Sequence, residues 1–339
     1  MRKTMLATVS LFLLIIPVLL FGAGKDAPIE LKMSHHGAAE SKNQEIMKAG
    51  ADWIEKRFPG RIKVTIYPSQ TLLNAASAYE GTVNGITDIA YVIPGWTQGR
   101  FPKTEVIDLP PAIPSAVDAT NVYWEFYKKF LADEWKAVKV LSIHVQVPQN
   151  IHTKKTPIRT LENIKGQKIR VYGVGKSIMN AFGGIPVAMP MPESYEAIRQ
   201  GIVAGIMVPF AEMKSYRLID VCNYHTQVYI HASPFFMVMN LQKYNSLPDD
   251  IRKAFDEELP AYWNRESARI WDRSEQEGVE FVRKTPGHQI ITLSPAERKV
   301  WNDRAKSING PWAQSLEAKG LPGKKLVEEK LKAIEKYIK

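Results

Sequence analysis

Residues 29–66, IELKMSHHGAAESKNQEIMKAGADWIEKRFPGRIKVTI, decide the fold class. The run from Ile29 to Ser34 predicts a buried strand, and residues 62–66 alternate between apolar and polar as a second strand would. Between them, apolar side chains recur at helical spacing until Phe58-Pro59-Gly60 breaks the pattern. This order of strand, helix and strand predicts a parallel α/β unit.

The same alternation continues along the chain. We expect strands at 88–93, 138–145, 168–172, 185–188 and 235–240, and helices at 79–83, 122–130, 177–182 and 193–203. A long helical stretch runs from Pro248 to Lys284, in which Pro260 either kinks one helix or starts a second. The sequence therefore predicts an α/β protein with two lobes that are joined by strands and by a long helix.

The N-terminus has the three parts of a secretory signal peptide. Arg2 and Lys3 give a positive start, an apolar run follows from Met5 to Phe21, and small residues precede the first later charges. We expect cleavage after Ala23 or Gly24, with an uncleaved membrane anchor as the alternative. The predicted signal peptide is therefore 1–24, and the mature protein is periplasmic and not embedded in the membrane.

The mature chain must fold without disulfides. Its one cysteine, Cys222, has no partner within the chain and lies in an apolar segment, which predicts a buried small residue. The mature chain of about 315 residues is longer than a single hydrophobic core usually supports, so two domains are expected.

Loss of Arg2 and Lys3 with the signal takes the formal charge from +10 to +8. The basic residues are scattered and interleaved with acidic ones, which argues against nucleic-acid binding and favours mild attraction of small anions.

Several short motifs invite a chemical interpretation and fail on detail. Gly173-Val174-Gly175-Lys176-Ser177 resembles the end of a phosphate-binding P-loop, but the position that requires the first glycine is Arg170. His35, His36 and Glu40 would supply metal ligands, yet adjacent residues at a strand end point in opposite directions. No nucleophile elbow is present in the sequence. We therefore predict no enzyme activity, no metal and no cofactor.

A family resemblance begins at Lys165-Gly166-Gln167-Lys168-Ile169-Arg170-Val171, where the chain resembles the DctP-type substrate-binding proteins of TRAP (tripartite ATP-independent periplasmic) transporters. It continues through 60–70, 84–90 and 193–205, and covers nearly all of the mature chain. The last segment, ESYEAIRQGIVAG, is similar to the family's E-x-Y-x-A-L-Q-x-G-x-V-D-G run, with Ile198, Arg199 and Ala204 as departures.

The resemblance implies a two-lobed periplasmic-binding-protein fold, class II-like, which closes on its ligand by hinge motion. It implies delivery of the ligand to membrane permease subunits, and a grip on the ligand carboxylate by Arg170. A guanidinium suits that role because its planar fork matches both carboxylate oxygens. The alternative for Arg170 is a structural salt bridge.

Other positions depart from the sialic-acid-binding members of the family. Asn150 stands where those relatives have a second arginine, and His36 where they have an asparagine; Val208 and Ile93 replace polar residues. Sugar hydroxyls beside Val208 and Ile93 would lose water without regaining hydrogen bonds, at about 1–3 kcal/mol each. We therefore expect a monocarboxylate with an apolar tail, such as an indole or phenyl acid.

The remaining expected ligand contacts include one amide, Asn74, and five aromatic side chains near strand ends: Phe210, Tyr172, Trp96, Phe235 and Phe236. The alternative for each aromatic side chain is a place in the hydrophobic core. Lobe I is predicted to comprise 25–147 and 236–275, and lobe II 148–235 and 276–339. The alternatives are a receptor for a C4-dicarboxylate, sugar acid or other small polar acid, a receptor that signals to a sensor kinase, and a periplasmic enzyme acting on a carboxylate through His36 and Glu40. Monomer and dimer both remain open.

Overall fold

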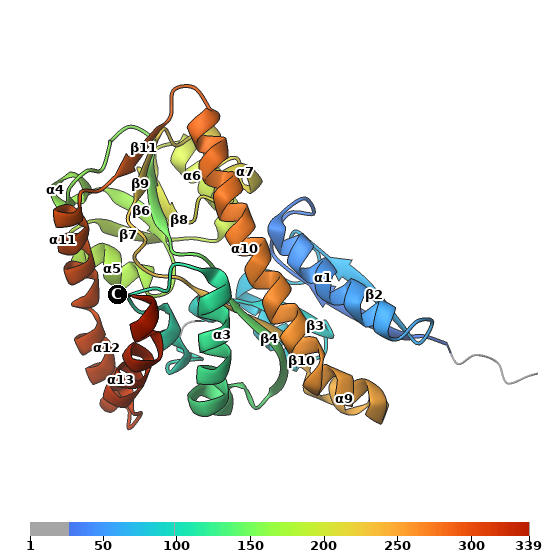
Figure 1. The fold of residues 1–339 in the computed structure, drawn as a ribbon. Helices are drawn as coiled ribbons and strands as arrows, with labels where there is room; N and C mark the ends of the chain where they lie inside the picture. Colours follow the sequence, from blue (N-terminus) through green and yellow to red (C-terminus); the bar gives the residue numbers. More distant parts are fainter. Residues whose placement is uncertain (1–26, 98, 339) are drawn as a thin grey trace, which may run out of the picture.

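The computed structural model describes residues 27–97 and 99–338, so the predicted signal peptide lies outside the described residues. Within them the strands form two sheets, each at the centre of one lobe (Figure 1). Lobe I has the order β2-β1-β3-β10-β4: β2 (Ile62–Tyr67), β1 (Ile29–Ser34), β3 (Ile89–Val92), β10 (Pro234–Asn240) and β4 (Val138–Val145). Lobe II has the order β11-β9-β5-β8-β6-β7: β11 (Gln289–Thr292), β9 (Tyr224–Gln227), β5 (Asn150–Thr153), β8 (Gly205–Val208), β6 (Lys168–Val171) and β7 (Ile185–Ala188).

Helices cover both sheets. They are α1 (Lys42–Arg57), α2 (Ala78–Val83), α3 (Ala116–Phe126), α4 (Leu161–Ile164), α5 (Gly175–Ala181), α6 (Ser194–Arg199), α7 (Glu212–Ser215), α8 (Leu241–Asn245), α9 (Asp249–Glu257), α10 (Leu259–Lys284), α11 (Pro295–Lys306), α12 (Asn309–Glu317) and α13 (Gly323–Ile334). No helix in the described ranges is both long and apolar enough to cross a membrane. The two-lobed α/β prediction is confirmed.

The first unit forms as its sequence indicates. β1 pairs in parallel with β2, and α1 crosses between them. Ser41 caps α1 by accepting a hydrogen bond from the backbone N–H of Gln44. The positive charges of Lys56 and Arg57 in the last turn stabilise the negative, C-terminal end of the helix dipole. Local signals and the sheet therefore specify the same structure.

The structure decides between the two expectations for Pro260 and shortens one other expected helix. Pro260 starts a second helix, α10, because its missing N–H costs nothing in a first turn. The helix expected over 193–203 ends at Arg199, since Gly201 adopts a left-handed backbone with φ of 76°. The early end frees the following residues to form β8.

The chain crosses between the lobes in two segments that belong to no helix or strand. Residues 146–149 lead from β4 to β5, and residues 228–233 lead from β9 to β10. The two crossings are bonded together: the N–H of Gln146 donates to the carbonyl of Ser233 at 3.1 Å, and the N–H of Gln149 to that of His231 at 2.8 Å. This pair of segments has the form of a hinge.

α10 runs along both lobes (Figure 1). It contacts α1 and β4 in lobe I, and α7 and β11 in lobe II. The C-terminal helices also reach both lobes, because α11 packs on α5 while α13 packs on α3. The lobes are thus joined on more than one side.

Candidate ligand-binding site

A narrow cavity lies between the lobes. Its walls come from strand ends, the hinge, short connecting segments and the helices α1, α7 and α10: His36, Asn43, Ile93, Trp96, Gln146, Arg170, Tyr172, Met191, Val208, Pro209, Glu212, Tyr216, Phe235 and Trp271. Its volume is about 20 Å³, which is little more than one water molecule requires. An organic acid would therefore enter only when the walls move apart.

Arg170 is the cationic group of this cavity. It lies on β6 and is fully buried, and its Nε and Nη2 donate to the carbonyl of Met189 at 3.1 and 2.9 Å. Its Nη1 is buried without a hydrogen-bond partner among the described residues. Burial lowers the pKa of Arg170, but a guanidinium still stays charged. A buried cation with a free donor is costly unless an anion joins it.

Aromatic rings from both lobes enclose the cavity. The ring centre of Trp96 lies 4.7 Å from His36 and 6.0 Å from Tyr172, and Phe235 lies 5.5 Å from Trp271. The guanidinium of Arg170 stands 5.1 Å from the ring centre of Tyr172. These walls provide flat apolar faces next to one positive charge.

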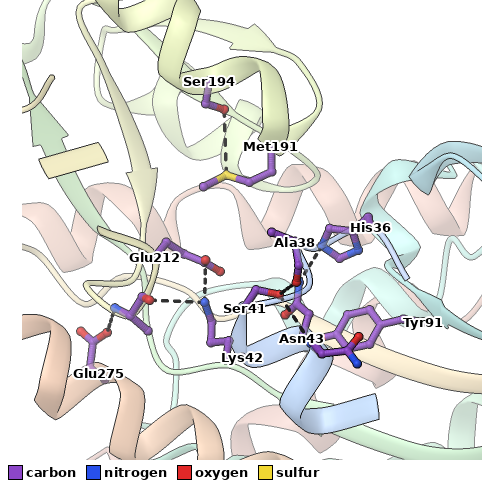
Figure 2. Close-up of polar contacts among 12 residues, drawn as sticks. His36, Ala38, Ser41, Lys42, Asn43, Tyr91, Met191, Ser194, Glu212 and Glu275 are labelled. Carbon is purple, nitrogen blue, oxygen red and sulfur yellow. Dashed lines mark hydrogen bonds and ion pairs between the residues drawn. The ribbon is translucent and has the colours of Figure 1, made fainter. Parts of the chain in front are cut away.

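A buried ion pair connects the lobes beside the cavity. Lys42 of α1 reaches Glu212 of α7 at 2.5 Å, and it also lies 4.5 Å from the ring centre of Trp271. Figure 2 shows Lys42 beside Glu212. Lys42 Nζ also donates to the carbonyl of Ala211 at 3.4 Å, and the N–H of Ala211 donates to Glu275 of α10 at 2.9 Å. The pair neutralises Glu212, so Arg170 remains the uncompensated charge of the cavity wall.

The Glu275 carboxyl makes folding stability depend on pH. Burial raises its pKa to about 7, well above the value of an exposed carboxyl. The folded state therefore holds this proton more tightly than the unfolded chain, and the free energy of unfolding falls as pH rises from about 4.5 to about 7. Between these pH values the free energy of unfolding of the wild type should fall by on the order of 3 kcal/mol because of Glu275, and we expect Glu275→Gln to abolish this fall.

Melting curves at pH 5, 6 and 7 check this expectation. Glu277→Gln is the matched control, because Glu277 lies on the same helix with an exposed side chain. Equal pH slopes for the wild type and Glu275→Gln would contradict the role given to Glu275.

The structure brings together many of the residues singled out from sequence. His36, Ile93, Trp96, Arg170, Tyr172, Val208 and Phe235 all line the cavity. Asn74 lies elsewhere: it caps a short 3₁₀ helix and faces a neighbouring hollow of about 600 Å³, which shares Trp96 and Tyr172 with the cavity.

Three further predicted contacts do not line the cavity. Asn150 accepts hydrogen bonds from the N–H groups of Val228 and Tyr229 at 3.1 and 3.3 Å, so it supports the hinge crossing. Phe210 packs against His152, at 4.9 Å between ring centres. Phe236 stacks on Trp135 at 3.9 Å, because adjacent strand residues point to opposite faces and Phe235 takes the cavity side.

Other cavity residues were not singled out from sequence. They are Asn43, Gln146, Met191, Pro209, Glu212, Tyr216 and Trp271. Asn43 and Trp271 lie on helices whose spacing predicts only a buried face, and Gln146 is a hinge residue without a motif. Glu212 follows the family-like segment 193–205 by seven positions, and this proximity is the local signal that could have identified it.

The rejected motifs have structural roles. Gly173 has a left-handed φ of 52°, and a Cβ there would lie 3.4 Å from the Cα of Gly95 in the other lobe, so this segment forms a close interlobe contact. His35 and His36 bond to Gln44 and Asn43. No group of three metal-binding side chains occurs among residues 27–97 and 99–338. Cys222 is buried, as expected, and burial raises the pKa of its thiol to about 12.

Two lobes that meet around a buried cationic cavity define a solute-binding protein. The model of the family "Bacterial extracellular solute-binding protein, family 7" (DctP) matches residues 33–314. The chain therefore belongs to this family, as a DctP-type substrate-binding protein of a TRAP transporter. Members of the family are receptors, so the enzyme alternative is excluded.

Solved structures and curated relatives agree with this assignment. A TRAP solute-binding protein from Rhodoferax ferrireducens T118, in complex with copurified benzoate, has a TM-score of 0.87 and 26% identity over 91% of this chain and 98% of that one. A marine metagenome TRAP protein specific for aromatic acids, in complex with metahydroxyphenylacetate, has a TM-score of 0.86 and 28% identity over 92% and 100%. The 2,3-diketo-L-gulonate-binding periplasmic protein YiaO of Escherichia coli K12 is 22% identical over 88% and 91%.

Proposed function

We propose that this receptor binds a small aromatic monocarboxylate, such as a phenyl or indole acid, and delivers it to the membrane permease of its transporter. The observation that carries the proposal is the buried guanidinium of Arg170, whose Nη1 has no partner among the described residues, in a cavity walled by aromatic rings. A carboxylate would complete the hydrogen bonds of Arg170 and balance its charge.

The charge of the cavity wall favours one carboxylate over two. Arg170 is positive, and Glu212 is balanced by Lys42. Burial lowers the pKa of His36 to about 3, so this ring is neutral at neutral pH. A C4-dicarboxylate would bring a second negative charge without a matching cation on the wall, and an unpaired buried charge is strongly unfavourable.

The apolar walls favour a ring over a sugar. Ile93, Val208 and Phe235 line the cavity and bury apolar surface, which gains about 25 cal/mol per Å² removed from water. The aromatic acids in the complexes of two similar structures support the same class of ligand.

We propose further that the ligand is held between the lobes with the boundaries expected from sequence, 25–147 with 236–275 and 148–235 with 276–339. The hinge is formed by the two bonded crossings, and the export signal at 1–24 is cleaved near Ala23 or Gly24. Opening at the hinge would widen the narrow cavity and admit the acid.

A thermal melt with a panel of acids tests the ligand class. We expect phenylacetate, benzoate or indole-3-acetate at 100 times the dissociation constant to raise the melting temperature by about 5 °C, because binding adds about 2.7 kcal/mol to the free energy of unfolding. Succinate, sialic acid and glucuronate are expected to produce no shift. Stabilisation by these polar acids and not by the aromatic ones would overturn the proposal.

A further inference from the structure

Several buried polar atoms on the lobe I side of the cavity have no partner among the described residues: Nε1 of Trp96 and of Trp271, and one atom each of two amides and an imidazole. Asn43 Oδ1, His36 Nδ1 and Gln146 Nε2 are buried and have no hydrogen-bond partner among the described residues. The exposed fractions of their residues are only 3%, 6% and 2%. All three residues line the same cavity as Arg170, which is contributed by lobe II. Leaving such atoms unpaired is unfavourable, and most buried polar atoms in native structures have a partner, so these atoms point to a bound group.

Asn43 and His36 are bonded to one another, and the bond fixes the character of the atoms that remain. Asn43 Nδ2 lies 3.0 Å from His36 Nε2 (Figure 2). If the amide donates to the ring, the free atoms are an amide oxygen that accepts and a ring N–H that donates. If the amide is turned and the ring donates, the free atoms are an amide NH₂ that donates and a ring nitrogen that accepts. Either arrangement leaves one donor and one acceptor.

The group is uncharged. Burial is the main cause that keeps His36 neutral, with His35, Lys42 and Arg170 adding to it. Lys42, which is next to Asn43 in the sequence, is a cation, but it is paired with Glu212. Gln146 adds a neutral amide. This wall therefore suits a neutral group that both donates and accepts, and it does not suit a second carboxylate.

We propose that Asn43, His36 and Gln146 form a second subsite, which recognises a hydroxyl group on the aromatic body of the acid held by Arg170. A hydroxyl donates one hydrogen bond and accepts others, which matches the mixed character of the free atoms. The ring of His36 also lies edge-on to Trp96, so the subsite adjoins the aromatic wall. This inference rests on the proposed function and narrows it to hydroxylated aromatic monocarboxylates.

The position of the subsite gives the hydroxyl a second role. Arg170 belongs to β6 of lobe II, whereas Asn43 and His36 belong to lobe I. A hydroxylated acid would thus bond to both lobes at once and stabilise their closed arrangement. An acid without the hydroxyl would leave buried groups of lobe I unpaired, which is how polar sites reject close analogues.

Calorimetry with matched ligand pairs tests the subsite in the full mature protein. The pairs are phenylacetate against 3- and 4-hydroxyphenylacetate, and benzoate against 3-hydroxybenzoate. We expect at least one hydroxylated acid to bind tenfold or more tightly than its parent, and we expect Gln146→Met and His36→Phe to reduce that ratio towards one. Gln242→Met is the control, because Gln242 of α8 is exposed and does not line the cavity, and it should leave the ratio unchanged.

The outcomes separate this inference from the proposed function. If the wild type binds each parent acid and its hydroxylated forms with equal affinity, the subsite is overturned while the proposed aromatic-acid receptor stands. This comparison uses only the wild-type protein, so it does not depend on the folding of a variant. A hydroxyl preference that persists in both variants would overturn the assignment to these residues. Failure of every aromatic acid to bind would overturn the proposed function, and the subsite with it.

Discussion

Replacement of Arg170 with alanine is expected to weaken binding of the carboxylate ligand by 100-fold or more. The guanidinium is fully buried and Nη1 has no other partner among the described residues, so the ligand carboxylate would lose its only uncompensated cation. Truncating one member of a buried charge pair typically costs 2–5 kcal/mol. Arg170→Lys keeps the charge but loses the planar fork, and should bind with intermediate affinity.

The same replacement should not destabilise the unliganded protein. The guanidinium of Arg170 hydrogen-bonds only to the carbonyl of Met189, faces the ring of Tyr172 and makes no ion pair within the described ranges, so its removal relieves a buried charge. Calorimetry gives the affinity, and thermal melting checks the fold. Arg159→Ala, at an exposed arginine of the same lobe, is the control and should change neither. Unchanged affinity in Arg170→Ala would contradict the role of Arg170 as the anchor.

Replacement of Lys42 with methionine is expected to reduce ligand affinity by about 100-fold, even though Lys42 is not on the cavity wall. The change would leave the buried carboxylate of Glu212 without its partner and remove the ion pair between the lobes. Glu212 would then compete with the ligand for Arg170, and the closed arrangement would become less stable. Opening of the lobes limits the cost to folding, since it returns Glu212 to water.

A double-mutant cycle separates this effect from general damage. The variant Lys42→Met with Glu212→Gln removes both charges, and replacing a buried pair entirely is often nearly neutral. We expect it to recover most of the lost affinity. Lys48→Met breaks the exposed pair with Asp52 on the same helix and should change affinity less than threefold. A double variant as weak as the sum of its single changes would show that the pair does not hold the lobes together.

The fold could be predicted to a large extent, because its strong signals are local. The alternation around α1 and the proline at position 260 each place an element boundary within a residue or two. The strands β5, β8, β9 and β11 were not predicted. The sequences of β5, β9 and β11, NIHT, YHTQ and QIIT, are short and carry polar residues, and β8 directly follows the stretch that was expected to be helical as far as residue 203. His152 and His225 are nevertheless fully buried, because they bond to each other at 2.9 Å. The periodicity of apolar residues cannot reveal a buried strand whose polar side chains hydrogen-bond to one another.

The candidate site could be predicted only in part. A motif led to Arg170, the comparison with sialic-acid-binding relatives led to Ile93, and strand ends led to Tyr172 and Phe235. All four residues line the cavity. Phe236 shows the limit of this reasoning, because which face of a strand meets the cavity depends on the register with β3 and β4. Glu212 and Trp271 reach the cavity from α7 and α10, and only the packing of the lobes brings those helices there.

A crystal structure of the mature protein with a bound aromatic acid, such as 3-hydroxyphenylacetate, tests the central claim most directly. We predict that the carboxylate lies within hydrogen-bond distance of Arg170 Nη1, with the ring between the aromatic walls that contain Trp96 and Phe235. A carboxylate bound elsewhere, with Nη1 of Arg170 still unpaired in the closed protein, would contradict it.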